Sequence, residues 1–228
     1  MLDKKEFIKF LIHSEVLTFG DFVTKSGRKT PYFINTGNFT TGEQLSVLGK
    51  YYADNIMENM MEGHIPQDVN VLFGPAYKGI SLSVATAISL AKDHGRNLKY
   101  CFNRKELKDH GEGGSLVGHK LQDGDKLLII EDVITAGTAV KECIPILKNQ
   151  ADVQICGLVI AVDRMEKGQG EASAIQDIYD EYGIPTFPLV NIKEILNLLL
   201  AGGIGNDGVS LLHMVASLEE YMSKYCVR

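Results

Sequence analysis

Two adjacent carboxylates that follow an apolar run are the residues of this chain whose types and spacing most clearly indicate chemistry. Residues 127–130 are all leucine or isoleucine, as in a buried strand, and Glu131 and Asp132 come directly after them. The small-residue turn TAGT occupies residues 135–138, and residues 139–149 have a helical pattern. The N–H groups of such a turn and of a helix amino terminus bind phosphate. The segment therefore predicts a phosphate site with two acids beside it.

The acids do not suit the phosphate itself, because like charges repel. They suit the hydroxyls of a sugar that carries the phosphate, or a metal ion bound to it, so we interpret the ligand as a phosphorylated ribose. The alternative is an ordinary buried strand with solvated acids and a turn that only caps a helix. Gly137 and the hydroxyls of Thr135 and Thr138 favour the binding site. The chain has no Walker A sequence, which is the main other type of phosphate loop.

Two further segments offer groups for an anion. The first is GPAYKG at residues 74–79, which follows a predicted strand and places Lys78 at the start of a helix. The second is RKELKDHGEGG at residues 104–114, where cations precede three glycines, as expected of a mobile loop that closes over a polyphosphate leaving group. Its four potential cations are Arg104, Lys105, Lys108 and His110. The alternatives are a plain strand-to-helix turn and a solvated charged loop.

Composition narrows the classes of function. The chain has 228 residues, 45% of them hydrophobic, and a net charge of −6, which argues against a general nucleic-acid-binding surface. The four cysteines are far apart and form no CxxC pair, so we expect free thiols, no zinc site and a cytoplasmic location. The amino terminus has no signal-peptide pattern. The most apolar helix candidate, residues 195–201, is far shorter than the ~20 residues that a membrane span needs.

Helices alternate with short strand-like runs, which is typical of an α/β fold with a doubly wound, mainly parallel sheet and flanking helices. We expect about five strands in this sheet, at about residues 69–73, 98–103, 127–131, 155–162 and 186–190. Helices are expected at about residues 3–13, 42–61, 80–93, 139–149 and 172–182 and at the end of the chain, and a further strand at residues 32–35. We interpret residues 1–228 as one domain, with a small hood within residues 1–62, a core at about 63–200 and a helical tail at 201–228.

Three more short sequences accompany these motifs, namely KSGR at residues 25–28, PYF at residues 31–33 and DR at residues 163–164. With the three longer motifs they make the chain, from about residue 20 to residue 190, closely resemble the orotate phosphoribosyltransferases, which are type I phosphoribosyltransferases. Residues 131–139 resemble the phosphoribosyl diphosphate (PRPP) motif of that whole superfamily, so they do not by themselves name the base. Ile34 departs from the family pattern, because an aromatic residue is often found there. A contact through its backbone would tolerate the change.

The resemblance implies transfer of 5-phosphoribosyl from PRPP to N1 of orotate, which gives orotidine 5′-monophosphate and diphosphate in pyrimidine (UMP) biosynthesis. It implies a PRPP site made of Lys25, Tyr77, Lys78, Arg104, Lys105, Lys108, His110, Glu131, Asp132, Val133, Ile134, Thr135, Ala136, Gly137, Thr138 and Ala139. The residues implied in catalysis are Lys105, Arg104, Lys108, His110 and Asp132. Orotate would contact Phe33, Ile34, Thr135 and Arg164, although a structural salt bridge is an equal alternative for Arg164.

The resemblance further implies Mg²⁺ as cofactor, held mainly by PRPP and water, with no direct protein ligand assigned. Members of this family are dimers whose mobile loop reaches the partner's site, so a homodimer with shared active sites is expected. Type I relatives also carry a non-proline cis bond in the loop that corresponds to Ala76-Tyr77. Two other functions stay open. A purine phosphoribosyltransferase would keep the PRPP turn but not KSGR or Arg164, and a PRPP-sensing regulator would not need the leaving-group loop.

Overall fold

The structure is a computed structural model of the chain, and it describes residues 2–24, 27–105, 115–134, 137–168, 170–202, 205–206 and 209–227. Five residues of the expected site lie outside these ranges, namely Lys25, Lys108, His110, Thr135 and Ala136. The other residues of that site are all described.

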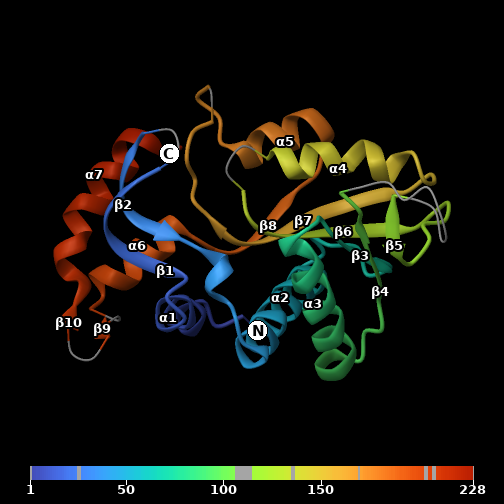
Figure 1. Cartoon of the computed structure of the whole chain (residues 1–228), viewed down its shortest axis with the longest axis horizontal. Helices are drawn as coiled ribbons and strands as arrows, with labels where there is room; N and C mark the ends of the chain where they lie inside the picture. The colour runs from blue at the N-terminus through green and yellow to red at the C-terminus, as the bar shows by residue number, and fades with distance from the viewer. Residues whose placement is uncertain are drawn as a thin grey trace.

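A six-stranded sheet forms the centre of the described structure (Figure 1), with the spatial order β5-β4-β3-β6-β7-β8. Neighbouring strands are parallel except β4 and β5, which pair antiparallel at one edge. The strands are β3 (Val71–Gly74), β4 (Lys99–Asn103), β5 (Leu116–Gly118), β6 (Lys126–Val133), β7 (Gln154–Asp163) and β8 (Thr186–Asn191). The expected α/β fold with a mainly parallel sheet is confirmed, and β5 is an edge strand that the sequence pattern did not predict.

Helices cover both faces of this sheet, so its central strands are buried on both sides. Residues 127–130 of β6 are all 0% exposed, which explains their uninterrupted apolar sequence. Alternate residues of a strand point to opposite faces. Leu127 and Ile129 join a core cluster with α4 and α5, whereas Leu128 and Ile130 join one with α2 and α3. The helices are α2 (Gly42–Met61), α3 (Lys78–His94), α4 (Thr138–Lys148) and α5 (Ala174–Tyr182).

The first and last parts of the chain fold together beside the sheet (Figure 1). The elements gathered there are α1 (Lys4–His13), the antiparallel hairpin of β1 (Leu17–Val23) and β2 (Lys29–Ile34), α6 (Ile192–Leu200) and α7 (Val215–Tyr225). The ring of Tyr221 in α7 packs edge-on against Tyr32 of β2, with 5.8 Å between the ring centroids. The tail, to which the sequence assigned no role, therefore packs on the hairpin of the hood. Short elements complete the chain, namely η1 (Thr36–Asn38), η2 (Leu211–Met214) and the ladder of β9 (Gly205–Asn206) with β10 (Val209–Ser210).

Strand β1 was not predicted from the sequence, because its pairing with β2 is irregular. The β1–β2 register shifts between Phe19 and Phe22, so the alternation of apolar and polar residues breaks in the middle of the strand. In contrast, the long helix α2 has the predicted bounds, and its first turn carries a capping box between Thr41 and Gln44.

All four cysteines are free and buried, as expected. No helix within the described ranges is long and apolar enough to cross a membrane.

Candidate active site

The predicted motifs meet at one edge of the sheet. Gly74 ends β3, Asn103 ends β4, Val133 ends β6 and Asp163 ends β7. Because these strands are parallel, their carboxyl ends share an edge, where ligands of doubly wound sheets bind. A cavity of about 280 Å³ lies at this edge, lined by Glu131, Asp132, Val133, Ile134, Gly137, Thr138, Ala139 and Val140.

The paired acids at the end of β6 are held rigidly, and their environments differ. Each residue is only 9% exposed. The backbone N–H of Asp132 donates to Glu131 Oε1 at 3.0 Å, and that of Val133 donates to Asp132 Oδ1 at 2.7 Å. The hydroxyl of Tyr52 in α2 donates to the carbonyl of Glu131 at 2.7 Å. These bonds hold the two carboxyl groups and the backbone of Glu131 in place.

Burial raises the pKa of Glu131 well above its ordinary value, and the negative charge of Asp132 adds to the effect. Burial would also raise the pKa of Asp132, but hydrogen bonds from Thr36 and Lys78 outweigh it and hold that pKa below its ordinary value. Lys78 Nζ lies 2.9 Å from Asp132 Oδ2 and 2.8 Å from Thr36 Oγ1, and the Thr36 hydroxyl donates to the same carboxylate oxygen. The pair therefore combines an acid that favours its neutral form with one that stays charged.

The turn after the acids leads directly into a helix. Gly137 has a left-handed backbone with φ of 70°, which glycine adopts without strain, and α4 begins at Thr138. The first N–H groups of a helix have no partner within it, and the helix dipole favours an anion at this end. The described half of the predicted turn therefore has the geometry of a phosphate site.

The GPAYKG loop packs tightly against the end of the sheet. A side chain at Gly74 would bring its Cβ within 2.0 Å of the carbonyl oxygen of Gly79, so only glycine fits there. The peptide bond between Ala76 and Tyr77 is cis, as the resemblance implied, and Tyr77 is 72% exposed. The N–H of Ala76 donates to the side-chain oxygen of Asn103 at 2.8 Å. Asn103 thus connects this loop to β4, a role that sequence reasoning missed.

Arg104 and Lys105 begin the cation-rich loop beside the same edge. Both line a cavity of about 180 Å³ together with Pro75, Ala76 and residues of α4. Among the described residues, Nε of Arg104 is one of three buried side-chain polar atoms without a hydrogen-bond partner. A buried donor of this kind is costly unless a ligand satisfies it. Arg104 is therefore well placed for an anion bound next to the Ala76 loop.

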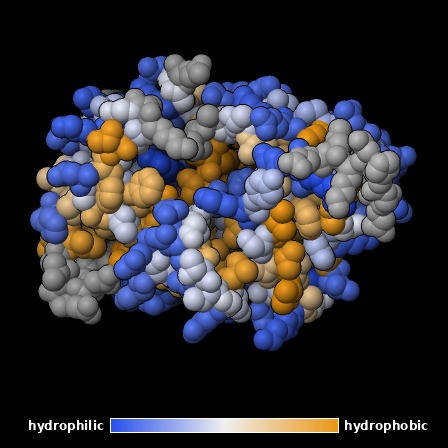
Figure 2. Space-filling view, viewed as in Figure 1, coloured by the Kyte–Doolittle hydropathy of each residue, from blue (hydrophilic) through white to orange (hydrophobic). Residues whose placement is uncertain are grey.

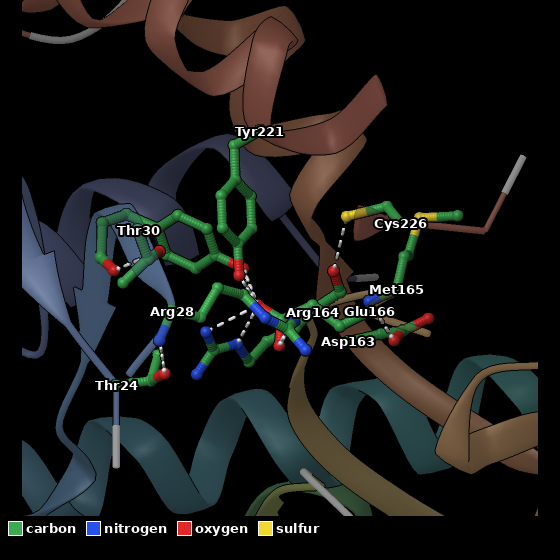
Figure 3. A network of polar contacts seen from close by, with 10 residues as sticks. Thr24, Arg28, Thr30, Asp163, Arg164, Met165, Glu166, Tyr221 and Cys226 are labelled. Atoms are coloured by element: carbon green, nitrogen blue, oxygen red, sulfur yellow. Dashed lines mark hydrogen bonds and ion pairs between the residues drawn. The ribbon is translucent and has the colours of Figure 1, made fainter. Parts of the chain in front are cut away.

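The residues expected to contact orotate approach from the hood and from β7. Arg164 follows β7, and its guanidinium lies over the ring of Tyr32 at 5.1 Å from the centroid. Arg164 Nε and Nη2 donate to Glu166 Oε1 at 3.0 and 2.6 Å (Figure 3). Burial alone would lower the pKa of Arg164, but Tyr32 and Glu166 raise it above its ordinary value. Arg164 therefore has the structural salt bridge that the sequence allowed, with donors left over, since a guanidinium carries five N–H groups.

Phe33 and Ile34 lie on β2, next to Tyr32. Phe33 is 42% exposed, and its ring packs 5.6 Å from that of Phe22. Successive side chains of a strand point to opposite faces, so Ile34 shares the face of Tyr32 that contacts Arg164, whereas Phe33 points to the other face. In the view of Figure 2, hydrophobic side chains are exposed between hydrophilic ones in the middle of the molecule.

This fold, with its sequence motifs gathered at one edge of the sheet, defines a class of protein. The model of the phosphoribosyl transferase domain family matches residues 38–179, so the chain is a phosphoribosyltransferase by fold and sequence. Orotate phosphoribosyltransferases of Clostridium beijerinckii and Clostridium acetobutylicum are 53% and 48% identical to it, with at least 97% of each chain covered. A crystal structure of orotate phosphoribosyltransferase from Francisella tularensis matches with a TM-score of 0.81 and 37% identity, over 97% of this chain and 99% of the other. The chain belongs to the orotate phosphoribosyltransferase family.

Proposed function

We propose that this chain transfers the 5-phosphoribosyl group of PRPP to N1 of orotate, which gives orotidine 5′-monophosphate and diphosphate. The observation that carries the proposal is the meeting of the acid pair, the turn before α4 and the GPAYKG loop at one edge of the sheet. These three elements suit the three parts of PRPP, which are its ribose hydroxyls, its 5′-phosphate and its diphosphate. Membership of the family favours orotate over a purine base.

In this proposal the acids bind the ribose, and the turn binds the 5′-phosphate. Asp132 accepts hydrogen bonds from the ribose hydroxyls in exchange for its contact with Lys78, which lies 2.9 Å from Asp132 Oδ2. Lys78 then becomes available to the diphosphate. Glu131, with its raised pKa, holds a hydroxyl without adding a full second charge near the phosphates.

The loop cations act on the leaving group. Breaking the bond between ribose C1 and the diphosphate oxygen leaves an oxocarbenium-like ribose and places charge on the diphosphate. Arg104 and Lys105, with Lys108 and His110 of the same loop, neutralise this charge as it develops. Loop closure excludes water, which would otherwise react with the cationic ribose. We propose that the loop serves the partner subunit of a homodimer.

The donor set fits Mg²⁺, which prefers oxygen ligands and is usually held by one or two carboxylates, substrate phosphates and water. In the part of the chain that the structure describes, no cluster of three or more His, Cys, Asp or Glu could hold a metal ion. Glu131 and Asp132 provide oxygen atoms at the cavity, so the ion would bind mainly through PRPP and water beside them. When bound, Mg²⁺ would supply further positive charge to the departing diphosphate.

Orotate carries a carboxylate on a planar ring, and the guanidinium of Arg164, which lies over the Tyr32 ring of the hood, could bind that carboxylate bidentately. Phe33, Ile34 and Thr135 would complete the base site. We also propose a cytoplasmic location, which the four free and buried thiols support, because a reducing compartment keeps thiols free.

An absorbance assay tests the proposal directly. The purified protein is mixed with PRPP, Mg²⁺ and orotate, and the decrease of orotate absorbance is followed. Parallel reactions contain adenine or hypoxanthine, and a further reaction contains EDTA. We expect turnover of orotate alone and none with EDTA. Turnover of a purine, or none of orotate, would contradict the proposal.

A further inference from the structure

The carboxylate of Glu166 is the centre of a buried polar network that joins three distant parts of the chain (Figure 3). Its Oε1 accepts hydrogen bonds from Arg164, from the Tyr221 hydroxyl at 2.6 Å and from the Tyr32 hydroxyl at 3.2 Å. Its Oε2 lies 3.4 Å from a guanidinium nitrogen of Arg28. The side chains of Arg164 and Glu166 are only 11% and 13% exposed. β2, the end of β7 and helix α7 therefore converge on a single carboxylate.

The charges of this network do not balance. Two guanidinium groups, of Arg28 and Arg164, share the one carboxylate of Glu166. The neighbouring Asp163 points away from them and accepts from the N–H of Met165 at 2.7 Å (Figure 3). Arg164 is largely buried and the side chain of Arg28 is 27% exposed, so one positive charge is in excess around Glu166, which favours binding of a further anion. A substrate carboxylate at Arg164 would neutralise it.

The carboxyl-terminal segment also holds the backbone that carries Arg164. The N–H of Val227 donates to the carbonyl of Met165 at 2.8 Å, and Cys226 forms an isolated β-bridge with Glu166. Met165 has a φ of 54°, a left-handed backbone that is strained for a residue with a side chain. The contacts with residues 226–227 support this conformation. Without them the segment that presents Arg164 would have no such restraint from the tail.

We propose that Glu166 and Tyr221 are positioning residues that orient Arg164 for orotate, and that the carboxyl-terminal helix α7 therefore contributes to the orotate site. Glu166 holds Nε and Nη2 of Arg164 in one plane above the Tyr32 ring, and Tyr221 fixes Glu166. The remaining guanidinium donors then face the carboxylate of the base in a fixed geometry. This inference rests on the proposed function, because it assigns to Arg164 the carboxylate of orotate.

A competing role for Glu166 gives the opposite result. Glu166 could act as a carboxylate that occupies Arg164 until orotate displaces it. In that case loss of its charge would tighten orotate binding, whereas the positioning role predicts that it weakens orotate binding. The variants below distinguish the two roles.

Tyr221→Phe is the most selective perturbation. It keeps the ring that packs on Tyr32 and removes only the hydroxyl that donates to Glu166. We expect the KM for orotate to rise about 3- to 10-fold, which is the range of the net contribution of one ordinary hydrogen bond, with the KM for PRPP unchanged. Glu166→Gln should raise the KM for orotate at least as much. Tyr225→Phe is the matched control, because it removes a hydroxyl from the same helix for which the described structure shows no hydrogen bond.

A double-mutant cycle tests whether Tyr221 affects orotate binding through Arg164. Arg164→Gln weakens orotate use by itself, and Tyr221→Phe should add nothing further in that background, because it acts through Arg164. An equal effect of Tyr221→Phe in both backgrounds would show a merely structural role and overturn the inference. An unchanged KM for orotate in Tyr221→Phe, or a lowered one in Glu166→Gln, would also overturn it. Thermal unfolding of each variant confirms that it is folded.

The wild type and Tyr225→Phe separate this inference from the proposed function. If both convert orotate normally, the outcome for Tyr221→Phe concerns the positioning role alone. If the wild type does not convert orotate, the proposed function fails, and the inference fails with it.

Discussion

Replacing Glu131 by glutamine should remove a pH-dependent loss of stability. The residue is 9% exposed, and burial together with the charge of Asp132 raises its pKa from 4.5 to about 8. Between these values the folded chain keeps a proton that the unfolded chain has released. The free energy of unfolding of the wild type therefore falls as pH rises through this interval. Glutamine has a similar shape, keeps the oxygen that accepts from the Asp132 N–H, and carries no charge.

The size of the effect follows from the displaced pKa. One pKa unit corresponds to about 1.4 kcal/mol, so the full interval sets a ceiling of about 5 kcal/mol. Part of this is lost when water and Lys78 rearrange around the charged carboxylate. We expect Glu131→Gln to gain about 2–4 kcal/mol over the wild type between pH 4.5 and pH 9, with most of the gain reached by pH 8.

Urea unfolding at several pH values, followed by circular dichroism, measures this difference. Glu219→Gln is the matched control for the substitution itself, since it makes the same chemical change at a residue that is exposed on α7. A difference between Glu131→Gln and the wild type that is constant from pH 5 to pH 9, or that shrinks with rising pH, would refute the reasoning.

Three further predictions concern catalysis. Lys105→Ala should lower kcat far more than it raises the KM for PRPP, by about 2.7–4 kcal/mol of transition-state stabilisation, and steady-state kinetics with a normal kcat would contradict this. Asn103→Leu removes the acceptor of the Ala76 N–H and should raise the KM for PRPP. Asn103→Ser has a hydroxyl that can still accept, so it should raise the KM for PRPP less. Equal kinetics of the two variants would exclude the role of this bond. Mixing the nearly inactive Lys105→Ala and Asp132→Asn homodimers under subunit exchange should restore up to about a quarter of wild-type activity, because half of the dimers are mixed and each has one intact site. No recovery after demonstrated exchange would mean that each loop closes over its own chain.

The core of the fold was predictable because its signals are local. A strand buried on both faces must be apolar along its length, and residues 127–130 show this directly. Helix α2 was predictable because its capping residues, Thr41 and Gln44, are three positions apart. Strand β1 was not, since its bulge interrupts the alternation. Strand β5 has three residues and depends on pairing with β4, so it lacks a pattern of its own.

The residues that sequence reasoning missed at the site act through partners far away in the chain. Thr36 contacts Asp132 across 96 positions, and Tyr52 contacts the carbonyl of Glu131 across 79. A threonine in a short polar segment or a tyrosine inside a helix has no local feature that indicates such a contact. Thr36 had one weak signal, its position directly after the aromatic strand that was expected to approach the ligand.

The two proposed substrate sites differ in how far apart in the chain their residues lie. Each proposed PRPP-binding residue that the structure describes lies within or soon after the core strand β3, β4 or β6, so a short motif contains both the group and its support. The orotate side is assembled from β2, the segment after β7 and the carboxyl-terminal helix, whose contacts at Glu166 span 134 and 55 positions. Changes in α7 can therefore alter recognition of the base while every PRPP motif stays intact. Family motifs alone thus report the phosphoribosyl donor more securely than they report the acceptor.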